Sequence, residues 1–461
     1  MELSYGRYLE SGFNFAEFLG YEYQFGIFFN CKTGEVINPY ETKEVYEYLS
    51  SLNNLRKMGY LDGNLSIKNN LSSENTYNND NSEEPHANSA DDTVPGDSPV
   101  SETGLPAEEL PAEENGNGTT DDSTDKNSEE SSYKGNEAST RETLDRPIVL
   151  AFAGDVNLDE NSKPVARYDN ENKGILGCIS QELVDEMNNA DIFMLNNEFA
   201  YSTRGTKIEG KSYTFRAHPK RVEILKEMGT DIVSLANNHA LDYGIDALLD
   251  TFTTLEEAGI DYVGAGRNME RAKAPVYYTI GDTTIAFVAA SRVIYAVDWY
   301  ATDKRPGMIG TYDPALFVTS IKEAKENSDF VVVYVHWGIE RINEPVKYQK
   351  ELAKIYIDAG ADAVIGCHPH VMQGIEFYNG KPIAYSLGNY WFNSSKRESG
   401  LLKIYLNPDG TSDIQLLPVM NENTYTYLIT DEKEKEKYYK FMKDISFDVE
   451  FDKDGFVTQN N

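Results

Sequence analysis

The stretch Ala363-Val364-Ile365-Gly366-Cys367-His368-Pro369-His370 ends a short apolar run with two histidines two residues apart. An apolar run of this length, followed by Gly and Pro, predicts a buried strand with the histidines at its carboxyl end. Neutral imidazole is a natural ligand for zinc, manganese and iron ions. The stretch therefore favours a metal site over a turn that carries two histidines by chance.

The other histidines of the chain support the same interpretation. The chain has 6 histidines. Four of them follow apolar runs that have the pattern of buried strands: His239, His336, His368 and His370. A chain that concentrates its few histidines at strand ends is predicted to build one shared site.

Apolar runs alternate with helical patterns from about Arg146 onward. Strands are expected at 148–154, 191–195, 231–235, 261–263, 285–290, 330–336 and 361–365. Helices are expected at 178–187, 219–228, 245–258, 314–326 and 346–359. Shorter strands, at least some of them antiparallel, are expected at 375–378, 382–387, 401–406 and 412–419. This alternation predicts an α/β core in which helices cover a largely buried sheet.

Composition divides the chain into four expected parts. Residues 1–60 are expected to form a small N-terminal module of unknown role. Residues 61–145 contain 21 acidic and 4 basic residues, a net charge of −17 that is half of the chain's −34, and few apolar residues, so a disordered acidic linker is expected there. Residues 146–425 are expected to form the folded domain, and 426–461 a helical and acidic extension.

The charge balance excludes one class of partner and leaves the location open. A chain of net charge −34 without a basic stripe is not expected to bind nucleic acid. No run approaches the roughly 20 apolar residues of a membrane span, and no signal peptide is recognisable. The three cysteines, Cys31, Cys178 and Cys367, give no disulfide framework. A long polar spacer before a folded domain is nevertheless typical of a surface tether.

Polar side chains follow five of the expected strands. In an α/β sheet, ligands and catalytic groups gather at the carboxyl ends of strands. These ends read Gly154-Asp155-Val156-Asn157, Asn196-Asn197-Glu198, Ala236-Asn237-Asn238-His239, His336-Trp337-Gly338 and Gly366-Cys367-His368-Pro369-His370. Each contributes a carboxylate, a carboxamide or an imidazole to the predicted site.

The order of these segments resembles that of the calcineurin-like metallophosphoesterases. The more specific resemblance is to the bacterial capsule-synthesis family of the CapA (PgsA) type, which is linked to poly-γ-glutamate capsules. It extends to Asn237-Asn238-His239-Ala240-Leu241-Asp242-Tyr243-Gly244 and Tyr385-Ser386-Leu387-Gly388-Asn389, and it spans about 148–392. The resemblance implies a metallophosphoesterase-like mixed β-sandwich flanked by helices.

The resemblance also implies roles for individual residues. The metal ligands would be Asp155, Asn157, Glu198, Asn238, His336, His368 and His370. They would hold one or two divalent ions (manganese, zinc, iron or magnesium), with His239 as general acid and Asp242 orienting it. Asn157 stands where the family pattern of the phosphoesterases has His, and Glu198 where it has Asp, so one of the two metal positions is expected to be weaker.

Two arginines are candidate substrate contacts, and three functions remain open. Arg216 and Arg292 could meet an anionic substrate, although a surface arginine explains Arg216 equally well. The first function is a CapA-like role in biosynthesis or export of an anionic capsule polymer or its phosphorylated precursor, alongside membrane-bound capsule synthesis proteins on the outer face of the cell. The second is a metal-dependent phosphoesterase or other hydrolase, and the third a non-catalytic scaffold.

Overall fold

The computed structural model describes residues 28–30, 35–37, 66–67, 144–393 and 395–460. Three short strands before the main body form a small sheet of their own: β1 (Phe28–Asn30), β2 (Glu35–Ile37) and β3 (Ser66–Ile67). The rest of the expected N-terminal module, and nearly all of the expected acidic linker, lie outside the described residues. Both therefore stay predictions.

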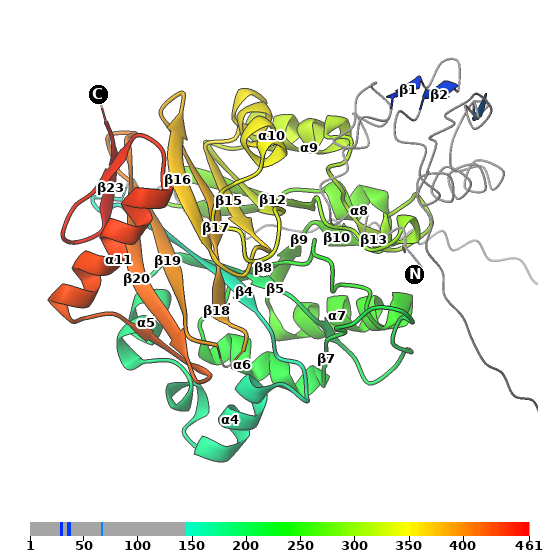
Figure 1. Cartoon of the computed structure of the whole chain (residues 1–461), viewed down its shortest axis with the longest axis horizontal. Helices are drawn as coiled ribbons and strands as arrows, with labels where there is room; N and C mark the ends of the chain where they lie inside the picture. Colours follow the sequence, from blue (N-terminus) through cyan, green and yellow to red (C-terminus); the bar gives the residue numbers. More distant parts are fainter. Residues whose placement is uncertain (1–27, 31–34, 38–65, 68–143, 394, 461) are drawn as a thin grey trace, which may run out of the picture. The chain divides into compact units, whose positions relative to one another are not determined.

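The larger sheet of the main body has ten strands (Figure 1). Its order is β22-β23-β20-β19-β4-β5-β8-β9, with β18 beside β4 and β21 beside β20. The strands are β4 (Ile148–Val156), β5 (Ile192–Asn197), β8 (Ile232–Ser234), β9 (Asp261–Val263), β18 (Asn389–Trp391), β19 (Arg397–Leu406), β20 (Ser412–Glu422), β21 (Tyr425–Leu428), β22 (Val449–Phe451) and β23 (Phe456–Gln459). Neighbours from β4 to β9 run parallel, whereas β19 pairs antiparallel with both β4 and β20.

The second sheet has six strands in the order β11-β12-β14-β15-β17-β16. They are β11 (Val276–Ile280), β12 (Thr283–Ser291), β14 (Phe330–His336), β15 (Ala363–Cys367), β16 (Met372–Tyr378) and β17 (Lys381–Leu387). The four inner strands run parallel, and β11 and β16 close the two edges antiparallel. Every residue of β14 and β15 is buried, as expected for parallel strands that are covered on both faces.

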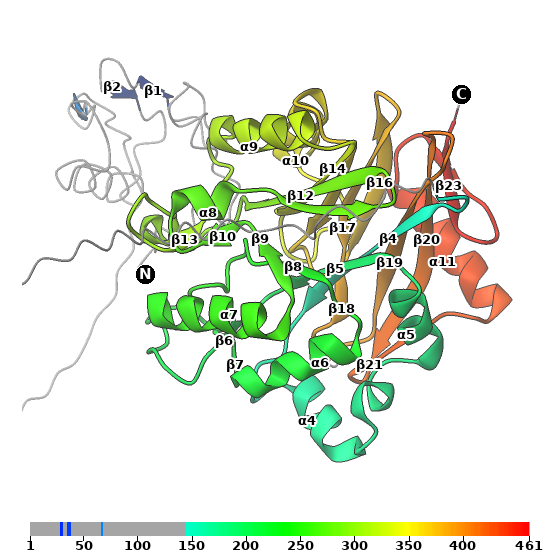
Figure 2. The same ribbon diagram turned by 180° about the vertical axis from the view of Figure 1, so that it is seen from behind.

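An apolar layer between the two sheets forms the centre of the fold. It contains Leu150 and Phe152 of the larger sheet and Phe287, Val332 and Ile365 of the smaller one. The outer face of the larger sheet packs against α5 (Gln181–Asn188), α6 (Val222–Glu227) and α7 (Gly244–Ala258). The outer face of the smaller sheet packs against α9 (Ala315–Glu326) and α10 (Lys347–Asp358) (Figure 2). The prediction of a mixed α/β fold is confirmed.

The remaining elements lie around these layers. The helices are α4 (Lys163–Glu171), α8 (Met269–Lys273) and α11 (Glu432–Ile445), with 3-10 turns η1 (Gly174–Gly177), η2 (Pro219–Arg221) and η3 (Val297–Trp299). The strands are β6 (Ala200–Tyr201), β7 (Arg216–Ala217), β10 (Ala265–Gly266) and β13 (Gly307–Met308). Within the described ranges, none of the helices has both the length and the apolar character needed to cross a bilayer.

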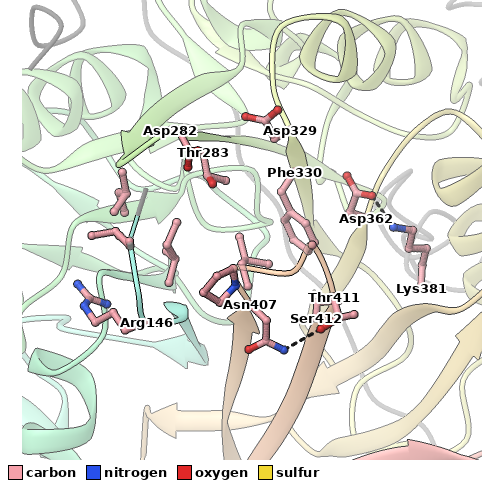
Figure 3. A pocket seen from close by; sticks show the side chains of 16 residues that line it. Arg146, Asp282, Thr283, Asp329, Phe330, Asp362, Lys381, Asn407, Thr411 and Ser412 are labelled. Atoms are coloured by element: carbon pink, nitrogen blue, oxygen red, sulfur yellow. Dashed lines mark hydrogen bonds and ion pairs between the residues drawn. The ribbon is translucent and has the colours of Figure 1, made fainter. Parts of the chain in front are cut away.

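The sandwich has two distinct ends. The carboxyl ends of β4, β5 and β8 in one sheet, and of β14 and β15 in the other, bring their polar segments together. At the opposite end a cavity of about 380 Å³ opens between the first residues of β4, β12 and β14 (Figure 3). One of the three carboxylates among the described residues that line it, Asp362, is paired with Lys325 and Lys381, at 2.9 and 2.7 Å.

Candidate metal centre

Glu198 lies at the middle of the predicted site. It follows β5 and is fully buried. Its Oε1 lies 3.9 Å from Nε2 of His239, 3.9 Å from Nε2 of His336 and 3.8 Å from Nε2 of His370. Among the described residues this oxygen has no hydrogen-bond partner. A buried carboxylate oxygen that faces three imidazole nitrogens without bonding to any of them is the donor arrangement that a cation would complete.

Asp155 joins the first strand of the body to the His-Pro-His turn. Its Oδ2 lies 3.0 Å from Nδ1 of His370, and the backbone N–H of His368 points at the same carboxylate, at 3.3 to 3.4 Å. Burial alone would raise the pKa of Asp155, but the hydrogen bond and charge of His370 outweigh burial and lower it. Burial likewise opposes the charged form of His370, yet Asp155 raises its pKa. In the metal-free chain these opposite shifts favour a carboxylate–imidazolium pair.

Asn196 holds the two carboxylates of the site side by side. Its Nδ2 donates to Oδ1 of Asp155 at 2.8 Å and to Oε2 of Glu198 at 3.1 Å. Burial, followed by the charge of Asp155, raises the pKa of Glu198 well above its ordinary value. Two carboxylates this close favour a bound cation, because a positive charge between them relieves both the burial cost and their repulsion.

His336 and His368 form the other side of the site. Nε2 of His336 lies 2.8 Å from Oδ1 of Asn238, and its Nδ1 lies 3.2 Å from Sγ of Cys367. Burial, followed by the neighbouring histidines, lowers the pKa of His336 well below its usual value and that of His368 to about 3. Nδ1 of His368 has no hydrogen-bond partner in the described part of the chain. Both rings are thus neutral and offer lone pairs, which metal ligation requires.

His239 is held by the carboxylate that was predicted to orient it. Oδ2 of Asp242 lies 2.6 Å from Nδ1 of His239 and also accepts the backbone N–H of Phe215 at 2.7 Å. Burial, followed by the charge of Lys211, lowers the pKa of His239 to about 4. The second nitrogen of the ring, Nε2, faces Glu198.

Asn157 is placed differently from the other predicted ligands. Its Oδ1 accepts the backbone N–H of Asp159 at 2.8 Å, a local bond that fixes the loop after β4. The residue is buried and lines the same cavity as His239 and His370. The amide oxygen at the position of the expected imidazole therefore bonds to the backbone of its own loop, and the weaker metal position stays a prediction.

A cavity of about 400 Å³ opens onto the site. Its lining includes Asn157, Phe215, His239, His370, Asn389 and Phe392, with the basic residues Lys163, Arg341 and Arg397. Neither predicted substrate arginine is among the described residues that line it. The guanidinium of Arg216 lies over the ring of Tyr243, and that of Arg292 is buried beside Tyr312 and Tyr348.

Several polar side chains in contact with the predicted site were not among its candidates. They include Asn196, Lys211, Cys367 and Asn389, whose Oδ1 lies 2.8 Å from Nδ1 of His370. Asn196, Cys367 and Asn389 stand inside the motifs quoted above, so a search of every polar residue in those motifs would have found them. Lys211 lies in a loop with no motif or periodicity, and nothing in the sequence points to it.

Comparison with known proteins matches the segment that carries this site. The family model of the bacterial capsule synthesis protein PGA_cap matches residues 149–394, just over half of the 461-residue chain. The chain belongs to this PGA_cap family. The resemblance to the CapA type is thereby confirmed, and the family segment contains every residue of the candidate site.

Curated relatives of the chain include proteins named for capsule or polymer synthesis. The PGA biosynthesis protein CapA of Bacillus subtilis is 37% identical over 213 residues, which cover 45% of this chain and 56% of that protein. The capsule biosynthesis protein CapA of Bacillus anthracis is 34% identical over 237 residues, covering 50% and 57%. A probable polyglutamine synthesis accessory protein of Mycobacterium tuberculosis is 32% identical over 208 residues, covering 43% and 55%. The chain spans about half the length of these relatives.

A solved structure of a putative 5′-nucleotidase from Staphylococcus aureus is similar over 64% of this chain and 58% of that chain, with 15% identity and a TM-score of 0.36. The family assignment rests on the sequence comparisons and not on this similarity.

Proposed function

We propose that this protein acts in the biosynthesis or export of an anionic capsule polymer, poly-γ-glutamate or a similar chain, through a divalent metal site in a metallophosphoesterase-like sandwich. Membership of the PGA_cap family supports the biological role. The observation that carries the metal site is the buried Oε1 of Glu198, which faces three imidazole nitrogens at 3.8 to 3.9 Å without a hydrogen-bond partner among the described residues.

The side chains present fit one or two divalent ions. One group of possible donors is Asp155, His336 and Cys367, and another is Glu198, His368 and His370, each with ligand atoms within 4.8 Å of one another. A mixture of neutral imidazole and carboxylate suits manganese, zinc or iron, whereas magnesium prefers oxygen alone. When bound, such an ion polarises an oxygen of the substrate or of water. Asn238 would complete the second position through its amide oxygen.

The protein's own groups would carry the proton chemistry. His239 lines the cavity, and Asp242 fixes the orientation of its ring from the side facing away from Glu198. A ring so held can take or give a proton at Nε2, next to the donors of the metal site. This arrangement favours hydrolysis over a purely structural role, so a metal-dependent hydrolase of phosphoester or related bonds is the second candidate.

The basic residues of the cavity support an anionic substrate. Lys163, Arg341 and Arg397 line the cavity together with His239 and His370, and outnumber its acidic lining residues outside the metal site, Asp159 and Glu340. The backbone N–H of Arg341 donates to the carbonyl of Pro369 at 2.7 Å, so the chain beside this arginine is tied to the His-Pro-His turn. Carboxylate or phosphate groups of a polymer would find complementary charge there. Membrane-bound capsule synthesis proteins are the proposed partners, and the outer face of the cell the proposed location.

The experiment is a metal analysis of the purified chain, followed by assays with phosphomonoester, phosphodiester and poly-γ-glutamate. We expect the wild-type chain to bind a divalent ion and to hydrolyse one of these substrates. His239→Ala should keep the ion and lose the activity. Metal without activity on any of these substrates would favour the non-catalytic scaffold. The metal site would be refuted if the purified chain binds no divalent metal and capsule formation nevertheless depends on this chain in the usual way.

A further inference from the structure

Lys211 is a buried cation beside the proposed catalytic histidine. Only 8% of its side chain is exposed. The rings of Tyr295 and Trp299 cover its ammonium group, with centroids 5.6 and 5.3 Å from Nζ. A lysine rarely gives up its hydration shell unless anionic or carbonyl oxygens replace the lost water. The partners that hold it here therefore indicate what it does.

Three of the contacts of Nζ lie in the segment 238–242. Nζ donates to Oδ1 of Asp242 at 2.6 Å and to the backbone carbonyl of Asn238. It also lies 3.2 Å from Nδ1 of His239. One ammonium group thus contacts three residues of a single turn, which carries one proposed metal ligand and the residue proposed to transfer protons.

The geometry also fixes the tautomer of His239. Nδ1 lies 2.6 Å from a carboxylate oxygen of Asp242 and 3.2 Å from Nζ of Lys211. The carboxylate is the nearer of the two, and it would repel a lone pair on Nδ1, so the proton is assigned to Nδ1. Lys211 bonds to one oxygen of Asp242, and the backbone N–H of Phe215 bonds to the other. The carboxylate therefore cannot rotate freely, and Nε2 of His239 is left with its lone pair toward Glu198.

Two side chains of this turn reach the candidate metal centre. Oδ1 of Asn238 lies 2.8 Å from Nε2 of His336, and Nε2 of His239 lies 3.9 Å from Oε1 of Glu198. A shift of the turn by a fraction of an ångström would change both distances. A residue that fixes the turn acts on the centre without touching it, as outer groups do for ligands in many metal sites.

We propose that Lys211 is a positioning residue of this centre. It holds the turn from Asn238 to Asp242 in place, and through Asp242 it keeps His239 in the tautomer with the proton on Nδ1. This proposal deepens the proposed function, and the effect of Lys211 on metal binding rests on that function. The effect of Lys211 on the tautomer of His239 does not rest on it, because the tautomer is a property of the metal-free chain.

The test compares Lys211→Met with a matched control in the full-length chain. Lys403 is equally buried, with 8% of its side chain exposed, and bonds to Glu186 at the same 2.6 Å, but it lies on β19 outside the site. Nitrogen NMR of the histidine rings in the metal-free protein reports the tautomer, with His239 identified by its loss in His239→Gln. Calorimetric titration with Mn²⁺ and with Zn²⁺ reports metal affinity.

We expect wild type and Lys403→Met to keep the proton of His239 on Nδ1 and to bind metal equally. Lys211→Met should give a mixture of tautomers and bind metal about 10- to 100-fold more weakly, and Lys211→Arg should restore the Nδ1 tautomer in large part. If Lys211→Met does not fold, Lys211→Gln is measured in the same way. An unchanged tautomer together with unchanged affinity would overturn the proposal. A wild-type chain that binds neither ion would refute the metal site instead, and the tautomer would still decide the role of Lys211.

Discussion

Asp155 and His370 lie 3.0 Å apart, carboxylate oxygen to imidazole nitrogen, although they come from different sheets of the sandwich. The contact holds a strained turn. His368 and His370 both have positive φ angles, 99° and 57°, in a region that side chains with a Cβ rarely adopt. The N–H of His368 and the ring of His370 both point at the carboxylate. The anion thus stabilises the backbone that presents the two imidazoles.

Asp155→Ala is therefore expected to destabilise the metal-free protein. Removing one partner of a buried pair leaves the other uncompensated, which costs about 3 kcal/mol. Denaturation by urea should show the loss as a lower midpoint with an unchanged slope. Asp409→Ala, which removes an exposed carboxylate in a turn, is the control and should change the midpoint little. An equal effect of both substitutions would show that Asp155 does not hold the turn.

Glu198→Gln is expected to have the opposite effect in the absence of metal. Burial and the neighbouring Asp155 raise the pKa of Glu198, so the neutral amide relieves a cost that the carboxylate carries. The metal-free variant should be at least as stable as wild type. It should also lose most of the stabilisation that metal gives wild type, about 2.7 kcal/mol at a free metal concentration of 100 times the Kd.

Thermal unfolding with and without Mn²⁺ measures both effects of Glu198→Gln. Glu256→Gln, which removes a surface ion pair with Arg267, is the control. A variant that keeps the full metal-induced rise in Tm would exclude Glu198 as a ligand.

The cysteines of the described body are expected to be unreactive in the native protein. Burial raises the pKa of Cys178 to about 12 and that of Cys367 well above its ordinary value. Both thiols are thus protonated at pH 8 and shielded from reagents, whereas thiol reagents attack the thiolate. In Cys31→Ser, Ellman's reagent should detect no thiol before unfolding and two after it. A thiol that reacts in the native state would contradict this burial.

Much of the fold could be predicted because its strands are encoded locally. The run 330–336 is apolar up to its last residue, His336, and became β14 with identical bounds. Helix α4 was missed because only Pro164 and Val165 of its residues are buried, which leaves no helical stripe to read. The chain after 426 was expected to be a helical and acidic extension. It contains α11 but also β22 and β23, which are too short for alternation to be visible.

The candidate site could be predicted as a set of segments but not as a set of contacts. The position of a residue at a strand end is a local property of the sequence, and it identified Asp155, Glu198 and His336 as candidates. Whether a polar side chain faces the site depends on distances between segments far apart in the chain. Arg292 follows β12 at the correct end, yet it lies beside the rings of Tyr312 and Tyr348. Lys211 contacts the site from a loop with no sequence signal at all.

The stabilisation that Arg221 provides is expected to depend on pH. Its guanidinium bonds to Glu160 at 2.9 Å and to Asp169 at 2.8 Å, and these bonds lower the pKa of both carboxyls. Groups with a lowered pKa stabilise the fold above their unfolded pKa values, near 4.5 and 3.8, and lose that effect as the pH falls through the folded values. Arg221→Met should cost about 1 kcal/mol at pH 7.

Urea denaturation between pH 7 and about pH 3 measures this dependence. The difference between Arg221→Met and wild type should shrink below about pH 4. Lys226→Met, which removes an exposed pair with Glu223, is the control and should change stability little at any pH. A difference that stays constant down to pH 3 would show that Arg221 stabilises by packing alone.

Gly154→Ala is expected to disturb the fold and the site together. A Cβ on Gly154 would lie 2.0 Å from the carbonyl oxygen of Gly388, which accepts the N–H of Asp155 at 2.9 Å. Neither backbone can yield without moving Asp155, so the loss should be about 3 kcal/mol or more, with weaker metal binding. Gly380→Ala is the contrasting variant, because its φ is +73° but no atom lies within 4 Å of the added carbon. It should cost about 1 kcal/mol and leave metal affinity unchanged. Equal losses in urea denaturation would mean that β4 and the chain before β18 approach less closely than the structure indicates.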